Sequence, residues 1–329
     1  MFVAPDPRYP LLPPELAAIM QATPASGQVT AETLATTRAR AVAGMTGQPR
    51  PAVHTIVDRA IPGPVGPVPI RVYKPGPGAG LPVLVFAHGG GWVMCDLETH
   101  DALCREIANR AGVVVVAVDY RLAPEHPFPA PLEDFYAAAT WVVENARQVG
   151  GDPNRVAVGG DSAGGNLAAA VCLLTRDRGG PRFSMQWMAY PGLDGVSERE
   201  SWTTFAEGPL LSVSNARAMW RMYADGTDLR EPYISPLHAE TLEGLPPALI
   251  VAPGYDHGHD DAVAYAKALE AAGVPVTFHS FEGLCHGFLS YYAQVSACSA
   301  ALDYCCDVVR TALTAPCLPE GTPGRHSDQ

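Results

Sequence analysis

The sequence is poor in positive charge and has no long apolar run. Lysine and arginine number 22 against 34 aspartates and glutamates, which gives a net charge of −12 at pH 7. A surface of this sign repels phosphate backbones and anionic headgroups, so neither nucleic acid nor a charged membrane surface is expected as the main partner. No stretch of about 18 uninterrupted apolar residues is present, which predicts a protein without a membrane span. The opening residues, MFVAPDPRYP, also lack the pattern of a secretory signal.

Cysteines with the spacing of metal or redox sites are missing too. The eight cysteines form no C-x-x-C pair and no spaced Cys/His set of the kind that binds zinc, so neither a metal nor another cofactor is expected. A reduced, cytoplasmic protein is the simplest interpretation. The cysteines stand at positions 95, 104, 172, 285, 298, 305, 306 and 317.

The order of apolar segments predicts an α/β fold in one domain of 329 residues. Wholly apolar strands alternate with helical segments, which is typical of a mostly parallel sheet with helices on both faces. The first two strands, separated by a Pro/Gly-rich turn, are expected as a hairpin at the sheet edge. The expected strands lie at 53–60, 68–74, 82–87, 113–118, 156–158, 185–190, 248–252 and 274–281. The expected helices after the second strand lie at 99–111, 131–149, 166–174, 260–272 and 293–313.

Two segments outside this alternation are expected to cover the sheet. Residues 1–50 predict an arm of two short helices, and residues 193–246 hold many large apolar side chains in helix and loop. Apolar helices inserted at the active edge of such a sheet usually form a cap, although a longer crossover connection is the alternative. The last residues, 316–329, are rich in Pro, Gly and polar residues and are expected to be disordered.

The stretch Val156–Asn166, VAVGGDSAGGN, places a serine between a strand and a helix. Glycines stand two positions before and two positions after Ser162, and an Ala/Leu-rich segment typical of helices follows. The glycines allow a sharp bend that exposes the hydroxyl, and the helix N-terminus favours an anion beside it. The pentapeptide alone arises by chance in glycine-rich chains, but the flanking strand and helix favour a nucleophile.

A serine hydroxyl needs a base, and His286 has the position for one. It follows the last predicted strand in a glycine-flanked loop, and its ordinary pKa near neutrality suits proton transfer. Because sites in parallel sheets lie beyond the carboxyl ends of the strands, this loop is expected beside Ser162. The competing histidines nearby are His257, His259 and His279.

Asp256 is the candidate carboxylate that fixes the tautomer of the histidine. It follows the predicted strand 248–252, again at a carboxyl end. Asp260 and Asp261 are rivals, but they stand in the first turn of the next predicted helix, where acidic residues complement the helix dipole. The chain order Ser162, Asp256, His286 is that of the α/β-hydrolase fold.

The oxyanion of an acyl-transfer intermediate needs N–H donors, each worth a few kcal/mol. The backbone N–H of Ala163 is one candidate. The run Gly89, Gly90 and Gly91 follows a buried strand, and glycines let the backbone approach a substrate closely. A triple glycine alone is typical of a plain loop, whereas here it predicts an oxyanion hole.

These motifs resemble those of the bacterial hormone-sensitive-lipase-like esterases, a family of α/β-hydrolases. The matching stretches cover roughly residues 81–290: HGGGW at 88–92, DYRLAPEHPFPA at 119–130, GDSAGGN at 160–166, and the loops of Asp256 and His286. The resemblance implies an eight-stranded sheet and a cap built from the N-terminal helices and the inserted segment. It also implies that Arg121 and Glu125 brace the loops.

The resemblance further implies a role for each site residue. Ser162 is the nucleophile, His286 the base and Asp256 its partner. The oxyanion donors are Ala163 and two glycines of the run 89–91, with Gly90 and Gly91 preferred and the choice uncertain by one position.

The chain departs from the family pattern after the seventh strand. The family often reads D-P-L-x-D-E there, whereas this chain reads DHGHDD at 256–261. The aspartate is kept, but the shape of the loop and of the adjacent pocket is in question. The alternatives are a tolerated surface variation and an adventitious metal site on His257, His259 and Asp260. Cys285 directly precedes the candidate base, which predicts a site sensitive to thiol reagents.

The sequence thus predicts a serine carboxylesterase that hydrolyses short- to medium-chain acyl esters through an acyl-enzyme intermediate. Its partner is a small-molecule ester, and the protein is expected to be a monomer or homodimer. A hydrolase of a lactone, carbamate or aryl formamide is the first alternative, because the same triad serves each reaction. A lyase or a receptor on the same scaffold is the second, although a receptor usually lacks one triad member.

Overall fold

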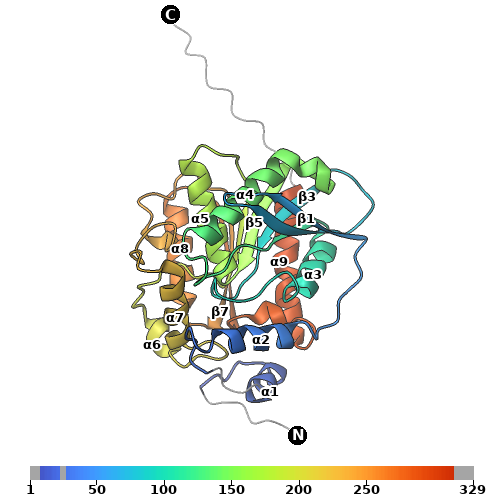
Figure 1. Ribbon diagram of the computed structural model, residues 1–329. Helices are drawn as coiled ribbons and strands as arrows, with labels where there is room; N and C mark the ends of the chain where they lie inside the picture. Colours follow the sequence, from blue (N-terminus) through green and yellow to red (C-terminus); the bar gives the residue numbers. More distant parts are fainter. Residues whose placement is uncertain (1–7, 23–26, 315–329) are drawn as a thin grey trace, which may run out of the picture.

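The computed structural model describes residues 8–22 and 27–314, and its centre is one eight-stranded sheet (Figure 1). The strand order is β1-β2-β4-β3-β5-β6-β7-β8. β1 and β2 form an antiparallel hairpin at the edge, β2 pairs antiparallel with β4, and the remaining neighbours are parallel. The mostly parallel sheet and its edge hairpin are therefore confirmed. The strands are β1 Thr55–Pro62, β2 Pro67–Lys74, β3 Leu81–Ala87, β4 Val114–Val118, β5 Gly151–Asp161, β6 Gln186–Ala189, β7 Ala248–Tyr255 and β8 Val276–Cys285.

Helices cover both faces of the sheet, as the apolar strands predict. Successive side chains of a strand point to opposite faces, so Val83 and Val85 of β3 pack in one core while Leu84 and Phe86 pack in the other. The first core is closed by α4 Ala130–Asn145, α5 Ala163–Asp177 and α8 His259–Ala271. The second is closed by α3 Asp101–Ala111 and α9 Ser296–Thr314.

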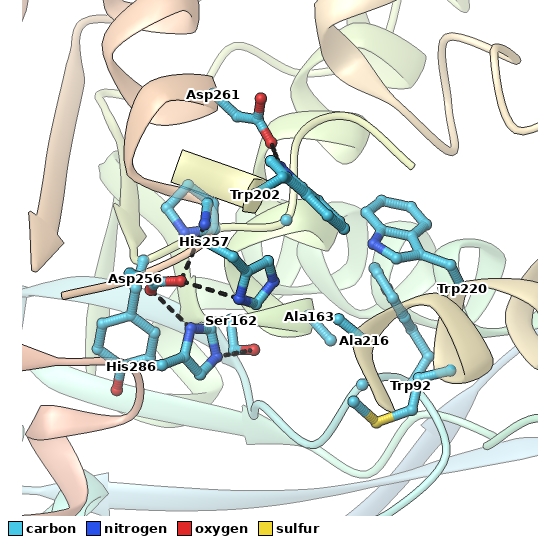
Figure 2. A pocket seen from close by; sticks show the side chains of 16 residues that line it. Trp92, Ser162, Ala163, Trp202, Ala216, Trp220, Asp256, His257, Asp261 and His286 are labelled. Atoms are coloured by element: carbon cyan, nitrogen blue, oxygen red, sulfur yellow. Dashed lines mark hydrogen bonds and ion pairs between the residues drawn. The ribbon is translucent and has the colours of Figure 1, made fainter. Parts of the chain in front are cut away.

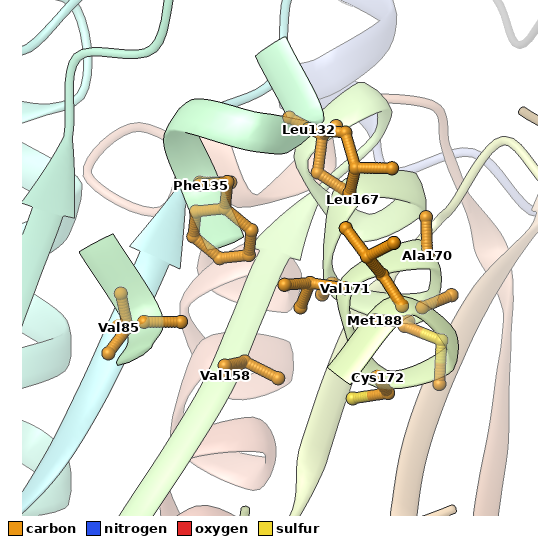
Figure 3. Packing of buried hydrophobic residues seen from close by; sticks show 14 of the residues in the cluster. Val85, Leu132, Phe135, Val158, Leu167, Ala170, Val171, Cys172 and Met188 are labelled. Atoms are coloured by element: carbon orange, nitrogen blue, oxygen red, sulfur yellow. The ribbon is translucent and has the colours of Figure 1, made fainter. Parts of the chain in front are cut away.

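The first core packs α4 and α5 directly onto the central strands (Figure 3). Phe135 of α4 lies near Val85 and Val158, and Val171 of α5 faces the same strands. Each of these side chains is at most 1% exposed. Burying one such side chain stabilises the fold by about 1.5–3 kcal/mol. Cys172 belongs to this core, where it packs as a small apolar residue. The helix behind the serine is thus held rigidly against the sheet.

Four helices gather at one end of the sheet, where Figure 1 shows α1, α2, α6 and α7 in the lower part of the view. The N-terminal arm and the inserted segment touch there, because the Val29 N–H donates to Asn215 Oδ1 at 2.8 Å. Val29 and Leu34 also share a small buried cluster with Met219. The helices are α1 Pro14–Ala22, α2 Leu34–Met45, α6 Glu200–Thr204 and α7 Val213–Ala224.

The loop after β4 is braced by two ion pairs. Nε of Arg121 lies 2.7 Å from Oδ2 of Asp134 in α4. Nη2 of Arg38 in α2 lies 2.7 Å from Oε2 of Glu125. The second pair is partly exposed, so it contributes little to stability by itself, but it ties the N-terminal arm to a loop of the sheet.

Element boundaries differ from expectation by a few residues. The helix predicted at 131–149 ends as an α-helix at Asn145 and continues as the 3₁₀ turn Ala146–Val149. Gly112 closes α3 in the left-handed conformation, with φ 68°, which a glycine adopts without strain. Two further 3₁₀ helices lie at Pro236–His238 and Phe288–Tyr291. The predicted tail at 316–329 lies outside the described residues.

The parallel strands bring the polar motifs to one edge of the sheet. β3 ends just before His88, β5 just before Ser162, β7 just before Asp256 and β8 just before His286. Because these strands run in the same direction, all four motifs lie at their carboxyl ends. In the part of the chain that is described, no helix has the length and apolar character needed to cross a membrane.

Candidate active site

Ser162 stands on a strained turn between β5 and α5. Its φ is 53° and its ψ is −118°, a conformation that costs a non-glycine residue of order 1–3 kcal/mol. The turn forces a close approach, because a Cβ at Gly164 would overlap the carbonyl oxygen of Ala87. A Cβ at Gly160 would overlap the same oxygen. The glycines on both sides of the serine are therefore a steric requirement, and the bend presents the hydroxyl beyond the sheet.

Ser162, His286 and Asp256 form a continuous hydrogen-bonded row (Figure 2). The serine Oγ lies 2.8 Å from His286 Nε2, and His286 Nδ1 lies 2.7 Å from Asp256 Oδ2. With the proton on Nδ1, the ring donates to the carboxylate and Nε2 accepts from the serine hydroxyl. The three residues follow three different strands, and the serine and the histidine are 124 positions apart in the sequence.

Burial and charge act in opposite directions on this row. Burial favours neutral groups, but the charge of Asp256 and its hydrogen bond outweigh it and raise the pKa of His286 above its ordinary 6.5. Burial likewise opposes the charge on Asp256, yet His286, His257 and the Gly258 N–H hold the pKa of that carboxyl below 3.8. Asp256 therefore stays ionised, and His286 is a stronger base than a free imidazole.

The rival side chains have other partners. Oδ2 of Asp260 accepts from the Ser201 N–H at 2.9 Å, and Oδ2 of Asp261 accepts from Trp202 Nε1 at 2.7 Å. Both stand in the first turn of α8, as predicted. His259 and His279 are also turned away: His259 Nε2 lies 3.1 Å from Ser280 Oγ, and His279 packs against Phe281 and Tyr304.

His257 is the second imidazole beside the carboxylate. Its Nδ1 lies 3.3 Å from Asp256 Oδ1, and the side chain is 8% exposed. Burial lowers the pKa of His257 to about 4, although the charge of Asp256 acts in the opposite direction. The ring stands edge-on to Trp202, with centroids 4.7 Å apart. His257, at which this loop departs from the family pattern, therefore lies inside the site as a neutral side chain and not on the surface.

The three glycines after His88 differ in what their N–H groups bind. The Gly89 N–H donates to Asp161 Oδ1 at 2.9 Å. The N–H groups of Gly90, Gly91 and Ala163 have no hydrogen-bond partner within residues 8–22 and 27–314. Gly90 and Gly91 have φ values of 112° and 59°, which favour glycine. Gly89 thus anchors the loop, while the other two glycines and Ala163 keep free donors.

A cavity of about 40 Å³ lies over the serine. Its walls include three tryptophans and a methionine, Trp92, Trp202, Trp220 and Met219. Figure 2 shows the indole of Trp202 above the triad, held by its bond to Asp261. One water molecule needs roughly 10–15 Å³ of cavity volume, so the cavity has room for about three water molecules. The site is small and mainly apolar.

Neither the predicted sensitivity to thiol reagents nor the alternative of an adventitious metal site finds support. Cys285 is fully buried, and burial raises the pKa of its thiol, so the group is protonated and inaccessible to reagents. His257 faces Asp256 while His259 faces Ser280, so the two imidazoles do not converge. Across the described residues no group of three His, Cys, Asp or Glu side chains is arranged to hold a metal ion.

Asp161 is a site residue that the sequence reasoning missed. It is 4% exposed, and besides Gly89 it lies 3.3 Å from both His100 Nε2 and the Tyr190 hydroxyl. The ring of Tyr190 in turn contacts His286, with centroids 5.1 Å apart. One signal was available, since a charged residue between a buried strand and the serine needs a buried partner. Its partners are far away in the chain, and no local pattern identifies them.

Comparisons with known proteins identify relatives of this chain. One family profile, described as the alpha/beta hydrolase fold, matches residues 84–290. Carboxylic ester hydrolase LipN from Mycobacterium tuberculosis is 47% identical over 261 residues, which cover 77% of this chain and 69% of LipN. Esterase LipI from the same organism is 46% identical over 263 residues, which cover 78% of this chain and 82% of LipI. The solved structure of a hyperthermophilic esterase from the archaeon Pyrobaculum calidifontis is 37% identical, with a TM-score of 0.85 over 92% of this chain and 99% of that chain.

Proposed function

Because this chain belongs to the hormone-sensitive-lipase-like family of α/β-hydrolases and is a carboxylic ester hydrolase, we propose that Ser162, His286 and Asp256 are its catalytic triad. The observation that carries the proposal is the continuous row of 2.8 Å and 2.7 Å contacts from serine to histidine to carboxylate. The raised pKa of His286 gives further support, because the charge and hydrogen bond of Asp256 outweigh burial and make the imidazole a stronger acceptor for the serine proton.

The proposed reaction proceeds in two steps through an acyl-enzyme. His286 Nε2 takes the Ser162 proton as Oγ attacks the ester carbonyl, and the carbonyl π electrons move to oxygen. The intermediate collapses, the bond to the alcohol oxygen breaks, and His286 returns the proton to the leaving alcohol. Water then repeats the sequence on the acyl-serine and releases the acid. Asp256 keeps the tautomer and stabilises the imidazolium at each stage.

The oxyanion in this scheme rests on backbone N–H groups. Ala163, Gly90 and Gly91 are the proposed donors, and the basis is that their N–H groups are free while that of Gly89 is bound to Asp161. The N-terminus of α5 adds its positive dipole end at the same point. Each donor contributes about 2.7–4 kcal/mol to transition-state stabilisation in comparable sites. In this proposal Gly89 acts only as the anchor of the loop.

We propose further that the described part of residues 1–50, together with residues 193–246, forms a cap over the site. Support comes from the contact between Val29 and Asn215 and from the position of Trp202 and Met219 in the cavity wall. With only about 40 Å³ free over the serine, acetyl and propionyl esters are the preferred substrates, and longer acyl chains require the walls to move. This narrows the expected short- to medium-chain range to its short end.

We propose that the protein is a cytoplasmic monomer or homodimer. Seven cysteines lie in the described part of the chain and all are free thiols, which fits a reducing compartment. Light scattering behind size-exclusion chromatography tests the oligomeric state, and a larger assembly would contradict it.

Ser162→Ala tests the nucleophile directly. The variant is expected to retain its fold and to lose nearly all hydrolysis of p-nitrophenyl acetate. A fluorophosphonate is expected to label the wild type at Ser162, as mapped by mass spectrometry of peptides. Labelling at another serine, or substantial turnover by the alanine variant, refutes the assignment. A chain-length series from acetate to octanoate tests the size limit, and equal rates along it would overturn the short-acyl preference.

A further inference from the structure

His257 brings an unused polar atom into a mainly apolar cavity. The residue lines the cavity over Ser162, and Figure 2 shows its imidazole beside Asp256 on the cavity side of that carboxylate. Nδ1 faces Asp256 Oδ1 at 3.3 Å. In the described residues the hydrogen bond of His257 is made by its backbone carbonyl, which accepts from Ser201 Oγ at 2.6 Å, and none is made by Nε2. The proposed mechanism uses neither nitrogen of this ring.

The surroundings decide which hydrogen-bonding role Nε2 has. Burial keeps the ring neutral at physiological pH, because it lowers the pKa of His257 to about 4. A neutral imidazole carries one proton, and the carboxylate beside Nδ1 favours the tautomer that places it there. Nε2 is then left with a free lone pair. It is therefore an acceptor and not a donor.

This acceptor is held in place. Trp202 stands edge-on to the ring at 4.7 Å, with an interplanar angle of 78°. On the other side the ring of His286 lies nearly parallel to it at 5.8 Å. Asp261 fixes Trp202 in turn through the 2.7 Å bond to its indole N–H. A fixed group binds a ligand without losing further conformational entropy, so the position of Nε2 is already suited to recognition.

The carboxylate acceptors of the cavity are already occupied. Asp261 accepts from Ser197, Trp202 and Arg199, and Asp256 accepts from His286 and the Gly258 N–H. Most of the remaining wall is apolar. A substrate donor that enters the cavity therefore meets Nε2 of His257 as its fixed acceptor.

We propose that His257 is a specificity residue that selects small esters carrying a hydroxyl donor, which binds to Nε2. The hydroxyl is on either the acyl part, as in a glycolate ester, or the alcohol part, as in a glycol monoester. The inference rests on the proposed function, because it concerns the substrate of the same serine site. An ester with a methyl group at that place leaves the acceptor without a partner once water is excluded, and such unpaired buried groups discriminate strongly between substrates.

Two pairs of nearly isosteric esters test the inference. Methyl glycolate and methyl propionate differ by hydroxyl against methyl on the acyl side, and 2-hydroxyethyl acetate and propyl acetate differ in the same way on the alcohol side. Released acid is followed by pH-stat titration, and kcat/KM is taken for each ester. For each pair, kcat/KM of the hydroxyl ester is divided by kcat/KM of the methyl ester. The measured quantity is the quotient of this ratio in the wild type and in His257→Phe, because the intrinsic reactivity of the esters cancels in it.

The expected quotient is about tenfold in at least one pair, which corresponds to about 1.4 kcal/mol. The pair that responds tells whether the hydroxyl belongs to the acyl or the alcohol part. His257→Gln, which keeps both a donor and an acceptor, is expected to recover much of the wild-type ratio. His259→Phe is the matched control: it makes the same change two positions away, outside the cavity wall, and its ratios are expected to equal those of the wild type.

A quotient near one in both pairs overturns the inference, and intact turnover of propyl acetate and methyl propionate then shows that the proposed ester hydrolysis stands. If the wild type hydrolyses none of the four esters, both proposals are wrong. His257→Leu replaces His257→Phe if the larger ring prevents folding, as judged by circular dichroism, and the same quotient is measured with it.

Discussion

Asp256→Asn removes one negative charge beside His286 and leaves the side-chain volume nearly unchanged. In the wild type, the carboxylate accepts from His286 Nδ1 at 2.7 Å, and its charge holds the histidine pKa above 6.5. An asparagine that turns its amide N–H₂ toward Nδ1 moves the ring proton to Nε2. The ring then donates to the Ser162 hydroxyl and has no lone pair for the serine proton.

Two effects follow, and both have a definite sign. The loss of the correct tautomer lowers kcat by about 10⁴, or about 5.5 kcal/mol in activation free energy. Burial of the ring remains after the charge is gone, and burial lowers the pKa of a histidine. Because His286 must be neutral to act as a base, the acid limb of kcat/KM therefore moves to lower pH. A substitution that merely disturbs the fold does not produce this shift.

The assay is the pH profile of kcat/KM for p-nitrophenyl acetate between pH 5 and pH 8, with thermal unfolding as the test of folding. Asp260→Asn is the matched control, since it makes the same change at a carboxylate that contacts Ser201 and not the triad. Its plateau and acid limb are expected to match the wild type. A plateau within tenfold of the wild type in Asp256→Asn, or an acid limb that stays in place, refutes the assigned role.

Two other perturbations test the loop before Trp92. Gly91→Ala is expected to lower kcat by about 10²–10³ with little change in KM. The reason is that φ is 59° at this position and the new Cβ would overlap Met219 Sδ. A kcat within threefold of the wild type would contradict an oxyanion donor at Gly91. Burial lowers the pKa of His88 to about 4, so between about pH 6.5 and pH 4 the unfolded chain binds a proton there that the folded chain does not. As the pH falls through this window, urea unfolding is thus expected to show that the wild type loses about 3 kcal/mol of unfolding free energy relative to His88→Gln. A difference that stays constant with pH would disprove the buried neutral state.

Much of the fold is legible in local sequence patterns. The run Val113–Val118 predicts a strand covered on both faces, and β4 is fully buried at Val114–Val118. The glycines beside Ser162 are visible in the local motif, although their steric reason comes from the fold, because any side chain at Gly160 or Gly164 would overlap the carbonyl oxygen of Ala87 at the end of β3. Strand direction then brings the loops after β5, β7 and β8 to one edge. For this reason the residues that contact one another there, Ser162, Asp256 and His286, can be named before any coordinates are known.

Contacts between distant segments are decided by packing, and local patterns are silent about them. The partner of Gly89 is Asp161, 72 positions away, and the partner of Trp202 is Asp261, 59 positions away. The loop of residues 256–261 illustrates the difference: its position after a strand favours Asp256 as the partner of His286, but the contacts of Asp260 with Ser201 and of Asp261 with Trp202 are decided by packing. Periodicity and turn chemistry act over a few residues, so they determine strands, helices and the serine turn. The direction of His257, the free donors of the glycine run and the 40 Å³ left over the serine depend on how side chains from separate elements fill the same space.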